Sequence, residues 1–533
     1  MNADETSQAA DNTKAGPSRS RGAERALWRD PMPPSKTYLD QVSGRVLDPA
    51  TAVPVPGVSP RPTVYVGQQL NISRFFDVPD LVAKLSEVAR GLGWRLEVVE
   101  DTSEADLAEA GLGLVKVRLF VADATSTRAP DAWALLQNAR ATFGIEAMQG
   151  VGLEHMLFIR PITPSPYHTP SPYHTPSPYH TPSPYHTPSP YGYDGREPVA
   201  YVGPQPQRRP NEAIPGRRVV VAILDTGCGK HPWLDGVVRT DVRPGGVPIG
   251  YTDPATDPEH HPDQVGQLDG IIDEYSGHGT FIAGLIHQAC PDADIVSWRI
   301  VGSNGPIVES DLVRALARIA LAAERHRAGD PRGQAIDVLS LSLGYYHETP
   351  EDYLFDPTMY GILKRLTDCG TVVVCSAGND GTARPMFPAA FGPWSDGTGP
   401  TPWDGVSLPI ISVGALNPNR DTDALFSNAG PWVRQYTLGA RVLSTLPTMF
   451  QGGLQPLART KAFGRVRESV DPDDFRGGFA TWSGTSFAAP LLAGQIAAHL
   501  VDRVGSADNP IAVKEAVEIA WSALAEETDL RPL

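Results

Sequence analysis

Cysteine, long apolar runs and positive charge are all scarce in this chain. The 533 residues include four cysteines whose spacing fits no metal-ligand pattern, so the sequence predicts neither a disulfide framework nor a metal site. Sparse cysteine also suits a reducing compartment. No run approaches the roughly 18 apolar residues of a membrane span, and residues 1–30 lack the apolar core of a secretory signal. These absences predict a cytoplasmic protein with no membrane partner, and they leave export by another route open.

The charge balance narrows the choice of partner. The formal net charge is −16, whereas a phosphate backbone attracts basic surfaces, so nucleic acid is not an expected partner. Hydrophobic residues make up 41% of the chain and charged residues 20%, a composition typical of globular proteins. A globular chain of this length is expected to form two or more domains.

The first 160 residues divide into two segments. Residues 1–60 mix charged, serine and proline residues with few apolar ones, so a disordered tail is expected there. Residues 61–160 show strand-like and helix-like stretches in the order strand, helix, strand, strand, helix, strand. This order predicts a small α+β domain of the ferredoxin-like type, with both helices on one face of the sheet. The expected elements are 64–69, 78–92, 95–99, 114–121, 132–143 and 146–158.

A proline-rich repeat follows this domain. Residues 163–191 contain five copies of Thr-Pro-Ser-Pro-Tyr, four of them followed by histidine. Two prolines in every six residues exclude helix and sheet and favour polyproline II, so residues 161–198 are expected to be a semi-rigid linker. The six-residue period also places the repeat histidines on one edge, which leaves a metal-binding or docking role open. These histidines are His168, His174, His180 and His186.

The remaining residues, 199–533, alternate strands and helices. This alternation predicts an α/β domain in three layers, with a mostly parallel sheet covered by helices on both faces. In such domains the functional side chains lie at the carboxyl ends of the strands. Strands are expected at 219–224, 294–301, 338–343, 372–375 and 409–415, and helices after Gly279, at 312–325 and 359–367, after Ser486, and at 512–523.

The hydroxyl of Ser486 is the first candidate catalytic group. It lies in the sequence Thr-Trp-Ser-Gly-Thr-Ser-Phe-Ala-Ala-Pro, where small residues precede an apolar helical run at Leu491–Leu500. A serine at an electropositive helix start can act as a nucleophile once a nearby base takes its proton. Taken alone, the segment fits a helix cap with packing glycines equally well.

Three further segments supply the groups that a nucleophilic serine needs. The sequence Val-Val-Val-Ala-Ile-Leu-Asp-Thr ends a buried strand on the carboxylate of Asp225, and Ser-Gly-His-Gly-Thr places His278 at the start of an apolar helix. The sequence Ser-Ala-Gly-Asn-Asp places the amide of Asn379 at the end of another strand. Together the four motifs resemble those of the subtilisin-like serine proteases, or subtilases, whose catalytic residues follow the same order of Asp, His and Ser. The resemblance covers roughly residues 219–500 and implies the subtilisin-like fold.

The resemblance implies a serine endopeptidase. Ser486 would attack a peptide carbonyl, His278 would take and return its proton, and Asp225 would orient the imidazole. Asn379 would donate to the oxyanion. No cofactor is implied, although structural calcium in the acidic stretch 253–274 stays open.

The resemblance also implies where a protein or peptide substrate would lie. Ser342, Leu343 and Gly344 match the edge that pairs with the substrate backbone, and Gly305 belongs to the segment that matches the opposing edge. The alternative is a non-catalytic scaffold of the same fold that binds peptides without cutting them.

The N-terminal domain has two interpretations. Its element order resembles that of many subtilase propeptides, which would make residues 61–160 an intramolecular inhibitor whose segment Leu157–Pro164 lies beside Ser342–Gly344. The other interpretation is an adaptor domain of a common fold, unrelated to inhibition.

Overall fold

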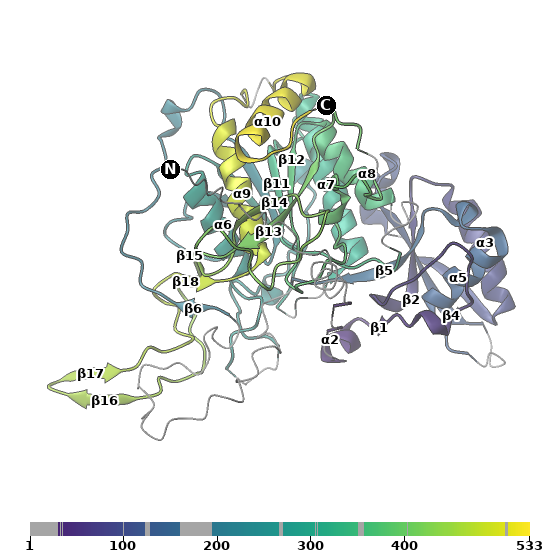
Figure 1. Cartoon of the computed structure of the whole chain (residues 1–533), viewed down its shortest axis with the longest axis horizontal. Coiled ribbons are helices and arrows are strands. Elements are labelled where there is room, and N and C mark those ends of the chain that lie inside the picture. The colour runs from purple at the N-terminus through teal and green to yellow at the C-terminus, as the bar shows by residue number, and fades with distance from the viewer. Residues whose placement is uncertain are drawn as a thin grey trace, which may run out of the picture.

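The chain forms a small N-terminal domain and a larger C-terminal domain that contact each other (Figure 1). The computed structural model describes residues 30–532 except 32, 35, 100, 123–127, 160–194, 266–269, 304, 306, 350–356, 402 and 507–509. The Thr-Pro-Ser-Pro-Tyr repeats and residues 1–29 therefore lie outside the described residues.

The N-terminal domain confirms the ferredoxin-like prediction. Its antiparallel sheet has the strand order β5-β2-β4-β3, and the two main helices pack together on one face. Each of these helices begins at an aspartate whose side chain accepts a backbone N–H of the first turn, and this bond fixes the start of the helix. The elements are β2 (Val64–Ser73), α3 (Val78–Gly91), β3 (Trp94–Val99), η2 (Thr102–Glu104), α4 (Ala105–Glu109), β4 (Leu114–Val121), α5 (Ala132–Phe143), η3 (Glu146–Met148) and β5 (Val151–Leu157).

The expectation of a disordered tail over residues 1–60 is wrong for its second half. Residues 36–51 form α2 (Lys36–Gln41), β1 (Gly44–Val46) and η1 (Pro49–Thr51). Strand β1 pairs antiparallel with β2, and Leu47 is 1% exposed. A strand of three residues can be stabilised entirely by the sheet that it joins, so few apolar residues are needed in the segment itself.

The C-terminal domain is built on a seven-stranded parallel sheet with the order β14-β13-β12-β11-β7-β9-β8. Its central strands are buried along their whole length, as continuous apolar runs such as Val220–Asp225 require. The five predicted strands are all present, within two residues at each end. The strands are β7 (Val220–Asp225), β8 (Val238–Arg239), β9 (Asp294–Arg299), β11 (Val338–Leu341), β12 (Val372–Ser376), β13 (Ile410–Leu416) and β14 (Gln435–Leu438).

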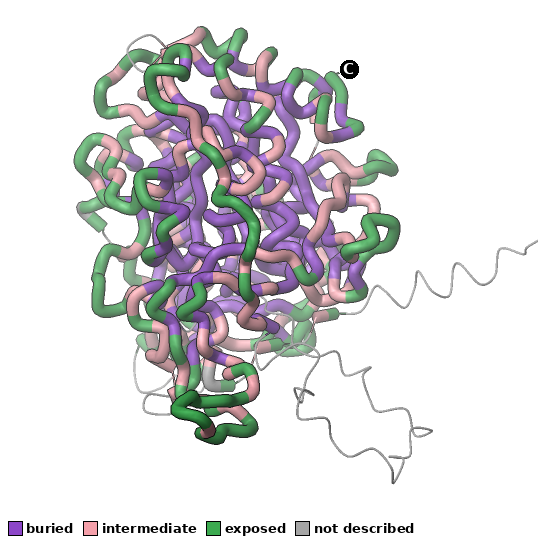
Figure 2. Tube along the Cα trace, turned by 90° about the vertical axis from the view of Figure 1, so that its left-hand side faces the viewer, coloured by how far each residue is buried: buried purple, intermediate pink, exposed green. Residues whose placement is uncertain are grey.

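Helices cover both faces of this sheet and enclose two cores (Figures 1 and 2). Helices α6 (His278–Ala289) and α9 (Thr485–Leu500) pack together on one face, with α10 (Val513–Glu527) against α9. Helices α7 (Glu309–Arg327) and α8 (Pro357–Asp368) pack on the other face. The three-layer α/β prediction is therefore confirmed.

Short strands lie outside the main sheet. Strand β6 (Glu197–Pro198) pairs with β18 (Phe479–Trp482), which also pairs with β15 (Val442–Thr445). The end of the expected linker at 161–198 is thus part of the C-terminal domain. Strand β10 (Ile307–Val308) is also short, and strands β16 (Arg459–Ala462) and β17 (Arg465–Glu468) form an exposed hairpin. Short 3-10 turns lie at Asn211–Ala213, Pro244–Gly246, Pro254–Thr256 and Ala389–Phe391.

Two features of the described residues bear on the compartment. None of the helices in the described part of the chain combines the length and the apolar character needed to cross a bilayer. The four cysteines are unpaired; they are Cys228, Cys290, Cys369 and Cys375.

Candidate active site

The carboxylate of Asp225 and the imidazole of His278 meet at the carboxyl end of β7. Asp225 is the last residue of β7 and His278 is the first residue of α6, and both are buried. Nδ1 of His278 lies 2.8 Å from Oδ1 of Asp225, and the same oxygen accepts the backbone N–H of Thr226 at 2.8 Å. The carboxylate is therefore placed to hold one ring orientation of His278.

The glycines on either side of His278 are required by the backbone. Gly277 has φ +86, a left-handed conformation that side chains disfavour. A Cβ on Gly279 would lie 2.0 Å from the carbonyl oxygen of Gly227, so only glycine allows α6 to approach the end of β7. The two glycines of the Gly-His-Gly motif thus allow the close packing that brings His278 to Asp225.

Ser486 lies in the first turn of α9, as the sequence predicts. Pro490 lies four residues later and has no N–H to donate to the Ser486 carbonyl, so the helix leaves this acceptor without its usual bond. The hydroxyl of Ser342 donates to that carbonyl instead, at 2.9 Å. The Ser486 hydroxyl donates to the carbonyl oxygen of Ser342 at 3.4 Å, so it points toward this neighbour rather than toward His278.

The amide of Asn379 is held beside Ser486 by Thr485. Oδ1 of Asn379 accepts the backbone N–H and the hydroxyl of Thr485, at 2.8 and 2.9 Å. The carbonyl end of the amide is therefore engaged, and the NH2 group is the end that can donate elsewhere.

One small cavity brings these groups together. Its volume is about 10 Å³, and its lining includes His278, Asn379 and Ser486 from the C-terminal domain and Ile159 from the N-terminal domain. Asp225 lies behind His278. The four side chains proposed from the motifs therefore converge on one site, at strand ends and helix starts.

Strand β5 of the N-terminal domain lies between two edges of the C-terminal domain. Leu157 pairs antiparallel with Ile307 of β10, and Phe158 pairs with Gly344 through backbone bonds of 3.1 and 3.4 Å. Residues 160–164 of the expected segment Leu157–Pro164 lie outside the described residues. A segment of extended chain therefore already occupies the place expected for a substrate.

The expected substrate-binding residues have different roles in this arrangement. Gly344 pairs with Phe158, the residue after β5, whereas the Leu343 side chain is buried in the core and Ser342 bonds to Ser486. The role expected for Gly305 stays a prediction: Gly305 lies beside the ring of Tyr275, and the backbone pairing in this segment occurs at Ile307 and Val308 of β10.

Glu259 was not identified from the sequence. It is 0% exposed and lies beneath the Asp225–His278 pair, where the hydroxyls of Thr226 and Thr280 each donate to it at 2.5 Å. Burial raises its pKa to about 7, against the lowering effect of the two hydroxyls. Acidic residues surround Glu259 in the sequence, a pattern typical of a solvated loop, and no local signal marks this one carboxylate as buried.

Arg196 was also missed. It lies five residues after the last repeat and is 1% exposed. Its guanidinium donates to the backbone carbonyls of Asp273 and Ser276, five and two residues before His278. The guanidinium carbon of Arg196 also lies 4.9 Å from the centroid of the Trp482 ring. The linker therefore ends on a residue that supports the loop carrying His278.

Comparisons with known proteins identify the family of the C-terminal domain. The sequence profile of the subtilase family matches residues 216–520. An intracellular serine protease of Paenibacillus polymyxa is 28% identical over 292 residues, which cover 53% of this chain and 66% of that relative. The major intracellular serine protease of Bacillus subtilis (strain 168) is 26% identical over 301 residues, which cover 54% of this chain and 69% of that relative. The solved structure of fervidolysin from Fervidobacterium pennivorans aligns with a TM-score of 0.42 and 18% identity, over 85% of this chain and 61% of its own.

Proposed function

Because the chain belongs to the subtilase family, we propose that it is a serine endopeptidase with Ser486 as its nucleophile. The observation that carries this proposal is the convergence of Ser486, His278 and Asn379 on one cavity, with Asp225 bonded to His278. A peptide carbonyl in that cavity would lie against the serine hydroxyl, and the chemistry requires no cofactor.

Each side chain has a role in the proposed reaction. The Ser486 hydroxyl turns from the Ser342 carbonyl to Nε2 of His278, which takes its proton as the oxygen attacks the peptide carbonyl. Asp225 holds Nδ1–H of His278, so Nε2 is the nitrogen that accepts the proton. The NH2 group of Asn379 donates to the oxygen that becomes negative. His278 then returns the proton to the leaving amine.

We propose that the substrate binds as a strand, between Ile307–Val308 on one side and Gly344 on the other. Strand β5 supports this placement, because it uses the same two edges for its own backbone bonds. Main-chain pairing of this kind gives affinity without depending on side chains.

We further propose that the N-terminal domain restrains the enzyme. Three contacts support this role: β5 occupies the substrate edges, Ile159 lines the cavity beside Ser486, and Glu154 accepts the backbone N–H of Ser310 at 2.8 Å. The last contact places a carboxylate at the electropositive start of α7. Propeptide and substrate would therefore compete for one groove.

A cytoplasmic location is also part of the proposal. Both relatives described above are named as intracellular proteases, and the four cysteines of this chain are unpaired. Cysteines that stay reduced suit a compartment kept reducing by thiol systems.

A serine-directed fluorophosphonate tests the proposed function. The Ser486 oxygen should displace fluoride from phosphorus, so full-length protein should gain the mass of one reagent less HF. Ser486→Ala should remove this labelling and lower peptidase activity about 10⁶-fold. Ser483→Ala is a matched control, since Ser483 lines the same cavity and its hydroxyl accepts the backbone N–H of Arg441. Labelling that persists in Ser486→Ala would assign the nucleophile to another residue.

A further inference from the structure

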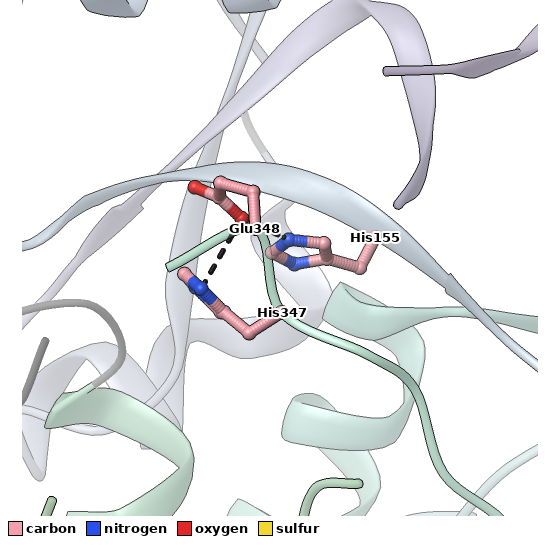
Figure 3. A group of neighbouring side chains, drawn as sticks. All are labelled: His155, His347 and Glu348. Atoms are coloured by element: carbon pink, nitrogen blue, oxygen red, sulfur yellow. Dashed lines mark hydrogen bonds and ion pairs between the residues drawn. The ribbon is translucent and has the colours of Figure 1, made fainter. Parts of the chain in front are cut away.

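A buried cluster of His155, His347 and Glu348 joins the two domains away from the proposed catalytic residues (Figure 3). His155 comes from β5, and the other two follow β11 along the chain. All three are at most 1% exposed, and one ligand atom from each lies within 4.8 Å of the others. The cluster therefore gathers two imidazoles and a carboxylate, which are ligands of transition metals.

A second carboxylate supports His155 from behind. Nε2 of His155 lies 2.7 Å from Oε2 of Glu348, and Nδ1 of the same ring lies 2.6 Å from Oε2 of Glu309. A metal-bound histidine commonly directs its other ring nitrogen at a carboxylate, which fixes the orientation of the ring. Glu309 has this position.

The carboxylate of Glu348 has few donors for a group buried so deeply. Nε2 of His155 approaches Oε2, but the other oxygen, Oε1, has no hydrogen-bond partner among the described residues. Nδ1 of His347 lies 3.2 Å from Oε2, yet the backbone N–H of Thr349 donates to this nitrogen at 3.0 Å, so it faces the carboxylate as an acceptor. A cation beside Oε1 would supply the partner that this carboxylate oxygen lacks.

An adjoining cavity provides an independent observation. Its volume is about 20 Å³, enough for one water molecule, and both His155 and His347 line it. Asn71 also lines this cavity and is 3% exposed, and neither its amide oxygen nor its amide nitrogen has a hydrogen-bond partner among the described residues. A polar side chain buried in this way indicates a missing ligand or water.

We propose that this cluster binds one divalent transition-metal ion of the Zn²⁺ type. The ligands are Nε2 of His155, a ring nitrogen of His347 and the carboxylate of Glu348. A water in the cavity, bonded to Asn71, completes the coordination. Tetrahedral bonds of about 2.0–2.2 Å place two ligand atoms roughly 3.4 Å apart, so Nε2 of His155 and Oε2 of Glu348 must separate by about 0.7 Å from their present 2.7 Å. The ligands lie far apart in the sequence, which is why their spacing predicts no site.

The ion would tie the N-terminal domain to the C-terminal domain. His155 belongs to the first domain, and His347 and Glu348 belong to the second, so the complete ligand set exists only while β5 is in place. This inference does not rest on peptidase activity, because its readout is bound metal.

Metal content and a cobalt spectrum test the proposal on the full-length chain. The repeat histidines can bind metal themselves, so all proteins in the test carry alanine at His168, His174, His180 and His186. After equilibration with Zn²⁺ and removal of free metal, the parent should retain one zinc per chain. With Co²⁺ it should show the visible absorption of a tetrahedral nitrogen and oxygen site, and its unfolding temperature should rise with either ion.

Two variants and a control assign the ion to the cluster. His347→Ala should lose the retained zinc and the cobalt spectrum, whereas Glu309→Gln keeps the shape of the side chain and should lower zinc affinity by about 10- to 100-fold. His287→Ala is the control, since His287 is an equally buried histidine of α6 in the C-terminal domain. It should retain one zinc.

The result that overturns the proposal does not depend on a variant. If the folded parent takes up no metal when Zn²⁺ or Co²⁺ is supplied in excess, the cluster is an ion pair. Protonated His155 then donates one ring N–H to Glu309 and the other to Glu348. Metal uptake that survives both His347→Ala and Glu309→Gln would place the ion elsewhere and would equally refute the assignment.

Discussion

Replacing Ile159 with alanine tests whether the N-terminal domain closes the proposed active site. Ile159 is 2% exposed and lines the same cavity as His278, Asn379 and Ser486. Truncating a buried isoleucine to alanine costs about 2–5 kcal/mol. A loss of about 3 kcal/mol weakens the closed state about 100-fold, at about 1.4 kcal/mol per factor of ten. The backbone pairs of β5 do not involve this side chain, so the domain should still close in the same position.

The rate at which a fluorophosphonate labels Ser486 in the full-length chain measures this closure. The reagent reaches the serine only in the open state, so the labelling rate is proportional to the open fraction while the closed state dominates. Ile159→Ala should therefore raise the rate about 100-fold. Ile145→Ala is the matched control, because Ile145 is a half-buried isoleucine of the same domain that packs beside Gly57 instead of the groove. It should leave the labelling rate unchanged.

An unchanged labelling rate in Ile159→Ala would refute the reasoning, provided that thermal unfolding shows an intact N-terminal domain. The serine would then already be accessible in the parent, and the pairing of β5 with β10 would be an adaptor contact. A higher labelling rate in both Ile159→Ala and Ile145→Ala would indicate general destabilisation of the domain instead of a specific block of the cavity by Ile159.

Three further predictions concern the C-terminal domain. Asn379→Ala should lower kcat by about 10²–10³-fold with little change in KM, measured on a peptide substrate, because the lost donor acts on the developing oxyanion. Glu259 has a pKa near 7 when folded, above its ordinary value of 4.5, so its contribution to stability falls as pH rises through this window, by about 3 kcal/mol in all. The test compares the free energy of unfolding of Ser486→Ala with that of Ser486→Ala/Glu259→Gln, measured by denaturant. Between pH 4.5 and pH 7 the Ser486→Ala protein should lose stability relative to the double variant. Equal pH dependence in the two proteins would contradict the burial of this charge. Thiol titration of the denatured, unreduced protein should find four thiols, and a titre of two or none would reveal a disulfide.

The residues of the proposed active site can be singled out from the sequence because each lies in a local motif. Asp225 ends an apolar strand, His278 lies between glycines, and Ser486 precedes an apolar helix, so strand ends and helix starts could be placed without tertiary information. Parallel topology then brings those ends to one edge of the sheet. The ferredoxin-like order of the N-terminal domain follows from hydrophobic periodicity in the same way.

The failures all concern contacts between distant segments. The pairing of β10 with β5, at Ile307 and Val308, depends on a strand of the other domain, which no local pattern indicates. Glu259 and Arg196 look like ordinary surface charges until the fold buries them. The partners Glu309 and Glu348 lie 154 and 193 residues from His155, a separation that no spacing rule covers.

Strand β5 belongs to two sheets at once, since it pairs with β2 inside its own domain and with β10 outside it. Lifting the domain away would therefore uncover an edge strand whose backbone groups and apolar side chains at Leu157, Phe158 and Ile159 all match the groove just vacated. A released domain could therefore bind again and compete with the substrate for the groove. If the domain restrains the enzyme as proposed, activation would become irreversible only when this strand is itself cut.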